Sequence, residues 1–184
     1  MYFSFGTRKI AEAAATLLRT EACRRMSYLR LLKLLYIADR EALRETGRPI
    51  VGTRPVAMAH GPVLGEIYDL VKGEHWDVPI WAEFIRRDGY EVELAKDPGV
   101  LTLSRCEIGM LTKTAEDHRD MDDWQLVGET HGFDEWRRNY HEGTSTPIPF
   151  EDIIEAVGRV SDREEILRDA AETKAVRKFF GCPV

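Results

Sequence analysis

The stretch from Met26 to Arg48 decides the fold, and it reads MSYLRLLKLLYIADREALRETGR. Its basic residues form one narrow stripe at helical spacing, at Arg30, Lys33, Arg40 and Arg44. A helix that shows water only one stripe must be wrapped by other elements, so we place this helix at the centre of the fold. Ser27 is its natural N-cap, and Gly47 suits the left-handed residue that ends it.

Length and composition favour one globular domain over residues 1–184. The chain has 184 residues, of which 43% are hydrophobic and 32% charged, and this length is enough for one well-buried core. Glu12 interrupts what would be the apolar core of a signal peptide, and no apolar run approaches the roughly 20 residues needed to cross a bilayer. We therefore expect a soluble cytoplasmic protein with no membrane partner.

The charge of the chain is unevenly distributed. The net charge is -6, but residues 1–54 hold eleven Lys/Arg against five Asp/Glu, whereas residues 107–135 hold nine Asp/Glu against two Lys/Arg. Solvated helix faces explain this pattern most simply. The alternative is a basic surface and an acidic surface that meet different partners.

Periodicity and capping residues predict the other elements. Helices are expected near residues 7–23, 63–72, 104–121, 124–130, 150–157 and 161–177. Pro62 is expected at the first position of the second of these, and Ser104 with Glu107 forms a capping box. Period-two segments on either side of Asp88 and Gly89 predict a hairpin over residues 82–94, with residues 100–103 as a third strand.

The expected fold is therefore mainly α. It is a single compact helical domain around a buried central helix, with a small antiparallel β-hairpin or three-stranded sheet. A loop is expected over residues 142–149 and a helical tail over residues 141–184.

The strong catalytic motifs are absent. The chain has no P-loop, no G-x-G-x-x-G after a strand, no H-E-x-x-H and no G-x-S-x-G. Its three cysteines lie far apart without a C-x-x-C pair, which argues against a structural zinc site or a disulfide frame. We therefore expect a protein that is not an enzyme and that needs no cofactor and no metal.

Two alternatives from other classes stay open. A metal-dependent hydrolase would build its site from His118, Asp122, His131 and His141, although helix capping explains the aspartates of residues 118–123 more simply. A DNA-binding transcriptional regulator of winged-helix type would use the N-terminal cations Arg8, Lys9, Arg19, Arg24, Arg25, Arg30 and Lys33 together with the hairpin. Because the chain is acidic and its second helix is too apolar to lie in a groove, nucleic acid is not the expected partner.

Four motifs in one order carry a resemblance to a known family. They are LKLLYIAD at residues 32–39, TGRPI at 46–50, AMAHGPVLGEIY at 57–68 and THGFDEW at 130–136. Together they resemble the Panacea domain, the SocA-like antitoxin family, with the strongest match over residues 26–140. The chain departs from the family at Asp39, where a His or a small polar residue is common, and at His60, where Tyr or Lys is usual.

The resemblance implies an antitoxin, encoded beside a toxin or carried on a prophage, that neutralises a cognate toxin by direct protein contact without catalysis. It also implies a AAA+ protease as a further partner, since a member of the family acts as an adaptor that delivers its toxin to such a protease. Self-association into a homo-oligomer stays open.

The candidate partner-binding residues are matched positions of these motifs: Tyr36, His60, Gly61, Pro62, His131 and Trp136. Each position also has a structural reading. Tyr36 suits the core, Gly61 and Pro62 suit a backbone turn, and His131 suits a ring bonded to the backbone beneath a packed Trp136. We expect the contact surface beside the Gly61 turn and the hairpin.

Overall fold

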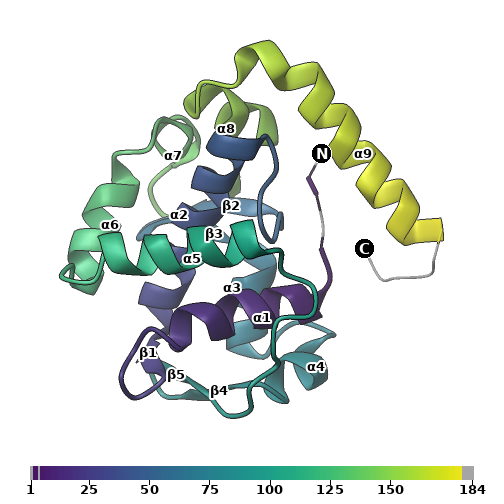
Figure 1. Ribbon diagram of the computed structural model, residues 1–184. Coiled ribbons are helices and arrows are strands. Elements are labelled where there is room, and N and C mark those ends of the chain that lie inside the picture. Colours follow the sequence, from purple (N-terminus) through teal and green to yellow (C-terminus); the bar gives the residue numbers. More distant parts are fainter. Residues whose placement is uncertain (1, 4, 180–184) are drawn as a thin grey trace.

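The structure is a computed structural model that describes residues 2–3 and 5–179. It is mainly helical, as predicted (Figure 1). Its α-helices are α1 (Thr7–Leu18), α2 (Tyr28–Thr46), α3 (Gly65–Lys72), α4 (Val78–Ala82), α5 (Arg105–Asp117), α6 (Asp123–His131), α7 (Asp134–Asn139), α8 (Phe150–Ala156) and α9 (Arg163–Phe179), with a 3-10 turn, η1, at Val160–Asp162.

Helix α2 begins and ends as its sequence predicts. The Ser27 hydroxyl accepts the backbone N–H of Arg30, and Gly47 ends the helix with φ +76°. The helix contacts α1, α3, α5, α6, α8 and two short strands, and α1 and α5 cross it on one side in Figure 1. Its leucines are buried along nearly the whole length.

The basic stripe of α2 was predicted to face water, but most of it is covered. Lys33 is 0% exposed and Arg30 and Arg40 are half-buried, so only Arg44 of the four is exposed. The reason is that chain segments far away in sequence cover this side of α2. Carbonyl groups and a carboxylate from those segments receive the cations, as described below for Lys33 and Arg40.

The predicted hairpin is present, but the prediction for its third strand is wrong. Strands β4 (Ile85–Asp88) and β5 (Glu91–Leu94) pair antiparallel, and β1 (Arg25–Ser27), which precedes α2, pairs with the other edge of β5. Residues 100–103 were predicted for that place. They form no strand, because the N–H and hydroxyl of Thr102 are bonded to the buried Glu12 carboxylate.

A second antiparallel sheet was not predicted. Strand β2 (Pro55–Met58) lies between β3 (Gly61–Leu64) and β6 (Thr146–Pro147). Pro62 therefore lies in an edge strand opposite Ala57, and helix α3 begins later, at Gly65. Proline is tolerated in an edge strand because such a strand has one side without a neighbouring strand, where no backbone N–H is needed.

Two further helices begin at capping residues that the sequence indicates. Ser104 with Glu107 forms the predicted capping box of α5, and Asp122 with Gln125 forms another at α6. Helix α7 was not predicted, because the sequence Asp134–Asn139 is short and polar. None of the described helices is long and apolar enough to cross a membrane.

Candidate partner-binding site

The turn between β2 and β3 lies directly against α2 and α6. Gly61 follows this turn with φ +90°, a conformation that favours glycine. A Cβ atom added at Gly61 would lie 2.5 Å from Thr130 Oγ1 and 2.9 Å from Lys33 Nζ. The glycine therefore gives the backbone both its unusual dihedral angle and its close approach to two buried side chains.

The buried Lys33 side chain stabilises the turn by a hydrogen bond. Its Nζ donates a hydrogen bond of 2.8 Å to the carbonyl oxygen of Pro62. Burial lowers the pKa of Lys33 to about 7, because a charged ammonium loses its hydration there. Among the described residues no carboxylate forms an ion pair with this ammonium.

His131, Trp136 and Tyr140 form a stack beside the turn. The ring centroids of His131 and Trp136 are 4.0 Å apart with an interplanar angle of 5°, and those of Trp136 and Tyr140 are 4.7 Å apart. The Trp136 indole N–H donates to the Met58 carbonyl at 3.0 Å. This bond fastens α7 to strand β2 and fixes the plane on which the His131 ring lies.

The His131 ring belongs to the same electrostatic group as Lys33. Burial lowers its pKa, and the nearby charge of Lys33 lowers it further, while a hydrogen bond with the Ala59 backbone acts in the opposite direction. The predicted structural reading, a histidine bonded to the backbone and packed on Trp136, therefore describes its geometry.

A buried ionic network joins α2 to α7. Glu135, which is 0% exposed, accepts a hydrogen bond from the Tyr36 hydroxyl at 3.0 Å and from Arg40 Nε at 2.9 Å, both at Oε1. The Arg40 guanidinium also lies over the Phe133 ring, 4.2 Å from its centroid. Burial and the Glu135 carboxylate together raise the pKa of Tyr36 well above its ordinary value.

The structure brings five of the six predicted residues into one region. Gly61, Pro62, His131 and Trp136 surround the end of Lys33 or the stack beside it, and Tyr36 reaches the neighbouring Glu135. Tyr36 is only 2% exposed, so its ring packs in the core in this structure. These five residues shape the region from within.

His60 differs from the other five because it lies at the exposed surface. The His60 and Trp124 rings pack in a T-shaped arrangement, with their centroids 5.3 Å apart and an interplanar angle of 82°. Trp124, on the first turn of α6, is 65% exposed. A large aromatic side chain exposed beside a rigid turn is typical of the residues that dominate protein interfaces.

Sequence reasoning missed several residues of this region: Lys33, Arg40, Trp124, Thr130 and Glu135. A charge inside an otherwise apolar helix was a signal for Lys33, but it also fits a solvent stripe. Glu135 gave no signal, because acids next to Asp134 at a helix start are ordinary capping residues.

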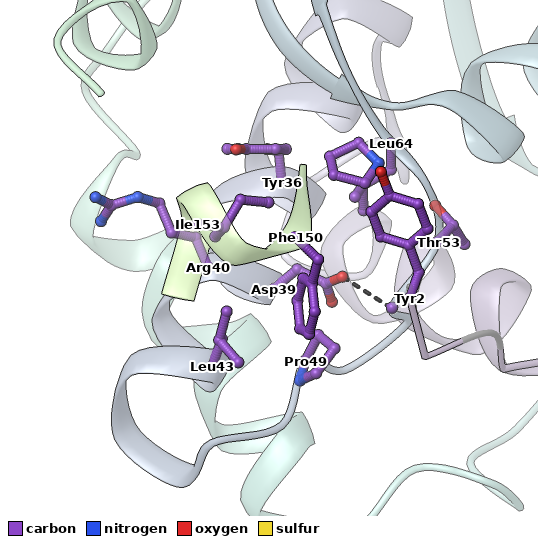
Figure 2. A pocket seen from close by; sticks show the side chains of 12 residues that line it. Tyr2, Tyr36, Asp39, Arg40, Leu43, Pro49, Thr53, Leu64, Phe150 and Ile153 are labelled. Carbon is purple, nitrogen blue, oxygen red and sulfur yellow. Dashed lines mark hydrogen bonds between the residues drawn. The ribbon is translucent and has the colours of Figure 1, made fainter. Parts of the chain in front are cut away.

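A small cavity lies between α2, α8 and the segment before β2, as Figure 2 shows. Its volume is about 30 Å³, and Tyr2, Leu43 and Phe150 give it apolar walls. The Asp39 carboxylate lies at this cavity and accepts the backbone N–H groups of Val51 and Gly52 at 2.7 and 2.9 Å. Such a volume holds one or two water molecules and no cofactor.

Asp39, one of the departures from the family pattern, thus has a structural role in this chain. Burial raises its pKa to about 6, while the two backbone N–H groups act in the opposite direction. The carboxyl group fixes the backbone that leads from α2 to β2.

Three of the four residues named for a metal site are engaged in other contacts. Asp122 caps α6, His131 lies on Trp136, and His118 contacts Glu129 and the Thr114 carbonyl. Within residues 2–3 and 5–179 no group of His, Cys, Asp and Glu side chains has the arrangement of a metal site.

Most of the cations named for DNA binding are also engaged within the chain. Lys9 pairs with Glu107, Arg19 with Asp97, and Arg25 with Glu91 of the hairpin. Arg30 donates to the carbonyl groups of His118 and Met121. A winged-helix reading needs these groups free for phosphates, and the hairpin itself supplies acids to one of them.

Comparison with known proteins places the region just described inside one family. The family model described as "Antitoxin SocA-like, Panacea domain" matches residues 31–137, which include most of α2, the central strand of each sheet, α6 and most of α7. Neither the comparison with curated proteins nor the comparison with solved structures gave a match. The resemblance recognised in the four sequence motifs is thereby confirmed, and the chain belongs to the SocA-like antitoxin family of Panacea-domain proteins.

Proposed function

We propose that this chain is an antitoxin that neutralises a cognate toxin by binding it directly, without catalysis and without a cofactor. The family supports an antitoxin role. The observation that carries the proposal is the exposed Trp124 ring against His60, on a turn that is fixed by buried groups. We name Trp124 and His60 the aromatic contact.

The structure around the aromatic contact supports binding rather than catalysis. Behind it, the Gly61 turn rests on Lys33 and the His131 ring rests on Trp136, so the backbone that presents His60 is rigid. A rigid support lowers the entropy that binding costs. The other candidate residues, Gly61, Pro62, His131, Trp136 and Tyr36, act in this proposal as that support.

Several finer points belong to the same proposal. We take residues 1–184 as one domain acting in the cytoplasm, as expected for a partner of an intracellular toxin. Delivery of the bound toxin to a AAA+ protease is a further step that the family resemblance suggests. It would need a second surface, free when the toxin is bound.

A growth assay with pull-down tests the proposal. The gene beside this one is induced alone and then together with this chain, and complexes are recovered from the same cells. The expected result is growth arrest by the neighbour, rescue by this chain, and recovery of the two proteins together. A harmless neighbour, or rescue without a complex, contradicts the proposal.

Two tryptophans provide a matched pair for locating the surface. Trp124 is 65% exposed beside His60, and Trp76 is 64% exposed beside His75, between α3 and α4. Trp124→Ala is expected to weaken toxin binding by about 2 kcal/mol or more, as for an aromatic hot spot. Trp76→Ala is the control and is expected to bind like wild type. Equal effects of the two substitutions would exclude the aromatic contact.

A further inference from the structure

Strand β4 has one edge without a neighbouring strand. Its sheet has the order β1-β5-β4, so β5 lies on one side of β4 and no strand of the described chain lies on the other. The hairpin of β4 and β5 lies at the bottom of the molecule in Figure 1, away from α8 and α9. Such an edge is a template to which an extended segment of another protein can add as a further strand.

The backbone groups of Arg87 point away from the sheet. In an antiparallel pair, residues that bond the neighbouring strand alternate with residues that do not. The Ala95 N–H donates to the Phe84 carbonyl at 2.8 Å, so residues 84, 86 and 88 bond β5 and residues 85 and 87 do not. Arg87 is exposed, and within residues 2–3 and 5–179 no hydrogen bond from outside the hairpin reaches its N–H or carbonyl. The edge therefore offers an accessible backbone donor and an accessible backbone acceptor.

Arg87 also carries a charge that no carboxylate of the described chain neutralises. Its neighbour Arg86, on the other face of the strand, pairs with Glu93. Arg87 Nε instead donates to the Gly89 carbonyl at 2.8 Å, and the guanidinium lies over the Tyr28 ring, 5.0 Å from its centroid. Its two terminal nitrogens have no hydrogen-bond partner among the described residues. They are held in place and available to an anion.

Two tyrosines surround this cation without supplying a negative charge. The ring centroids of Tyr28 and Tyr90 are 4.6 Å apart, and Tyr90 is 61% exposed. A hydrogen bond with Tyr90, together with burial, raises the pKa of Tyr28 to about 12, so the Tyr28 hydroxyl stays neutral. Exposed tyrosine and arginine side chains are enriched at protein interfaces.

A second copy of this chain is a poor match for the edge. Three antiparallel registers pair Arg87 with a residue of a second β4 strand or its turn. They set Arg87 opposite Arg87, Arg86 opposite Arg86, or Asp88 opposite Asp88. Like charges directly opposite each other destabilise a strand pair, whereas opposite charges stabilise it. The edge therefore favours a segment of a different protein that carries an acid opposite Arg87.

We propose that β4 accepts an extended segment of the protein partner as a fourth antiparallel strand, with an aspartate or glutamate of that segment opposite Arg87. The N–H and carbonyl of the acidic residue bond the carbonyl and N–H of Arg87, and its carboxylate meets the terminal nitrogens of the guanidinium. The inference rests on the proposed function for the identity of the partner as a toxin.

The free edge and the aromatic contact lie within reach of one partner. At the opposite edge of the same sheet, Ser27 Oγ donates to the Asp123 carboxylate at 2.6 Å, and Asp123 precedes Trp124. The sheet between β1 and β4 is two strand spacings wide, about 10 Å. A protein interface of ordinary size, about 800 Å² on each partner, covers such a distance.

Short strand-forming peptides test the edge without the toxin. The probe Ac-Thr-Val-Glu-Val-Thr-NH₂ is titrated into ¹⁵N-labelled protein, with Ac-Thr-Val-Lys-Val-Thr-NH₂ as the control of the same length. The glutamate peptide is expected to shift the amide signals of residues 85–90, and the lysine peptide is expected to bind at least about fivefold more weakly. Shifts located elsewhere, equal binding of the two peptides, or no binding overturn the proposal.

A methyl group on one backbone nitrogen of the probe tests strand pairing itself. Methylation of the glutamate nitrogen removes the N–H that faces β4, whereas methylation of the next valine nitrogen removes one that points away. The first change is expected to weaken binding about tenfold, and the second less than about twofold. Equal effects of the two methyl groups overturn strand addition.

Two substitutions of one charge separate the edge from general attraction. Arg87→Gln removes the charge at the edge, and Arg105→Gln removes an exposed charge at the start of α5 as the matched control. Arg87→Gln is expected to weaken binding of the glutamate peptide about fivefold, and Arg105→Gln less than about twofold. Thermal melts check that both variants are folded. Equal weakening by the two substitutions contradicts the proposed role of Arg87.

The same variants distinguish this inference from the proposed function. If wild type captures the neighbouring gene product and Arg87→Gln captures it equally well, the edge inference fails and the antitoxin proposal stands. If wild type captures nothing but the signals of residues 85–90 respond to the glutamate peptide as expected, the antitoxin proposal fails and the edge remains a site for acidic strands.

Discussion

Gly61→Ala is predicted to destabilise the protein through two separate effects. The first is backbone strain, because φ is +90° and a side chain in that region costs about 1–2 kcal/mol. The second is contact, because the new Cβ would lie 2.5 Å from Thr130 Oγ1 and 2.9 Å from Lys33 Nζ. Both neighbours are 0% exposed, and moving the ammonium weakens its bond to Pro62, at a cost of about 1–3 kcal/mol. The sum is about 2–5 kcal/mol.

Gly73→Ala isolates the first effect. Gly73 has φ +81°, but nothing lies within 4 Å of the position that its Cβ would take. Its substitution is therefore expected to cost only the backbone strain of about 1–2 kcal/mol. Urea unfolding followed by tryptophan fluorescence gives both free energies. If the two glycine variants lose the same stability within about 0.5 kcal/mol, the close packing of Gly61 against Lys33 and Thr130 has no energetic weight and the reasoning is refuted.

Three more predictions concern the interior. Leu35→Asp places an unpaired charge at a position 1% exposed on α2 and should abolish cooperative thermal unfolding; an unchanged melt by circular dichroism would contradict this. Burial lowers the pKa of Lys33 from its ordinary value of 10.5 to about 7 in the folded chain. Between these two pH values the unfolded chain binds more protons than the folded chain. The free energy of unfolding should therefore rise with pH in this range, by up to about 1.4 kcal/mol per pH unit. Lys33→Met should flatten that rise in urea midpoints measured between pH 7.5 and 10, and an equal slope would show that Lys33 does not cause it. Trp136→Ala should cost about 1–3 kcal/mol, because it removes a half-buried ring that is stacked on two others and bonded to Met58. The exposed Trp76→Ala should cost less than about 0.5 kcal/mol in the same urea titrations, and equal losses would contradict the prediction.

Local signals in the sequence predicted the elements that depend on local chemistry. Ser27, Gly47, Ser104 and Asp122 mark helix ends in the structure, and Asp88-Gly89 marks the hairpin turn. These residues act through their nearest backbone neighbours, so their effect is visible in a short stretch of sequence.

Pairing between distant segments was not predictable in the same way. Strand β1 was missed because three residues before a helix carry no strand pattern of their own, and they pair only because β5 offers Val92 opposite Met26. The β2–β3 sheet was missed because Pro62 before an apolar helical pattern indicates a helix start equally well. Which structure forms there depends on Pro55 to Met58 lying alongside, and that is a tertiary fact.

The candidate site also has residues that the sequence indicated and features that only the fold determines. The resemblance to the family named His60, Gly61, His131 and Trp136 before their positions in space were known. It did not show that Lys33 lies beneath the turn, since a lysine on a helix is normally exposed and only the fold determines that strands cover it.

The packing of α1 and α8 onto α2 has a practical consequence for work on this chain. Phe3 and Phe150 meet edge to face at 5.9 Å, Tyr2 donates to the Ile148 carbonyl, and α1 covers another side of the same helix. All of these residues lie outside the matched residues 31–137. A fragment trimmed to the aligned stretch would therefore expose large apolar faces of α2 to water, and we expect it to aggregate. The matched stretch marks what the family shares, and we expect the unit that folds on its own to be longer.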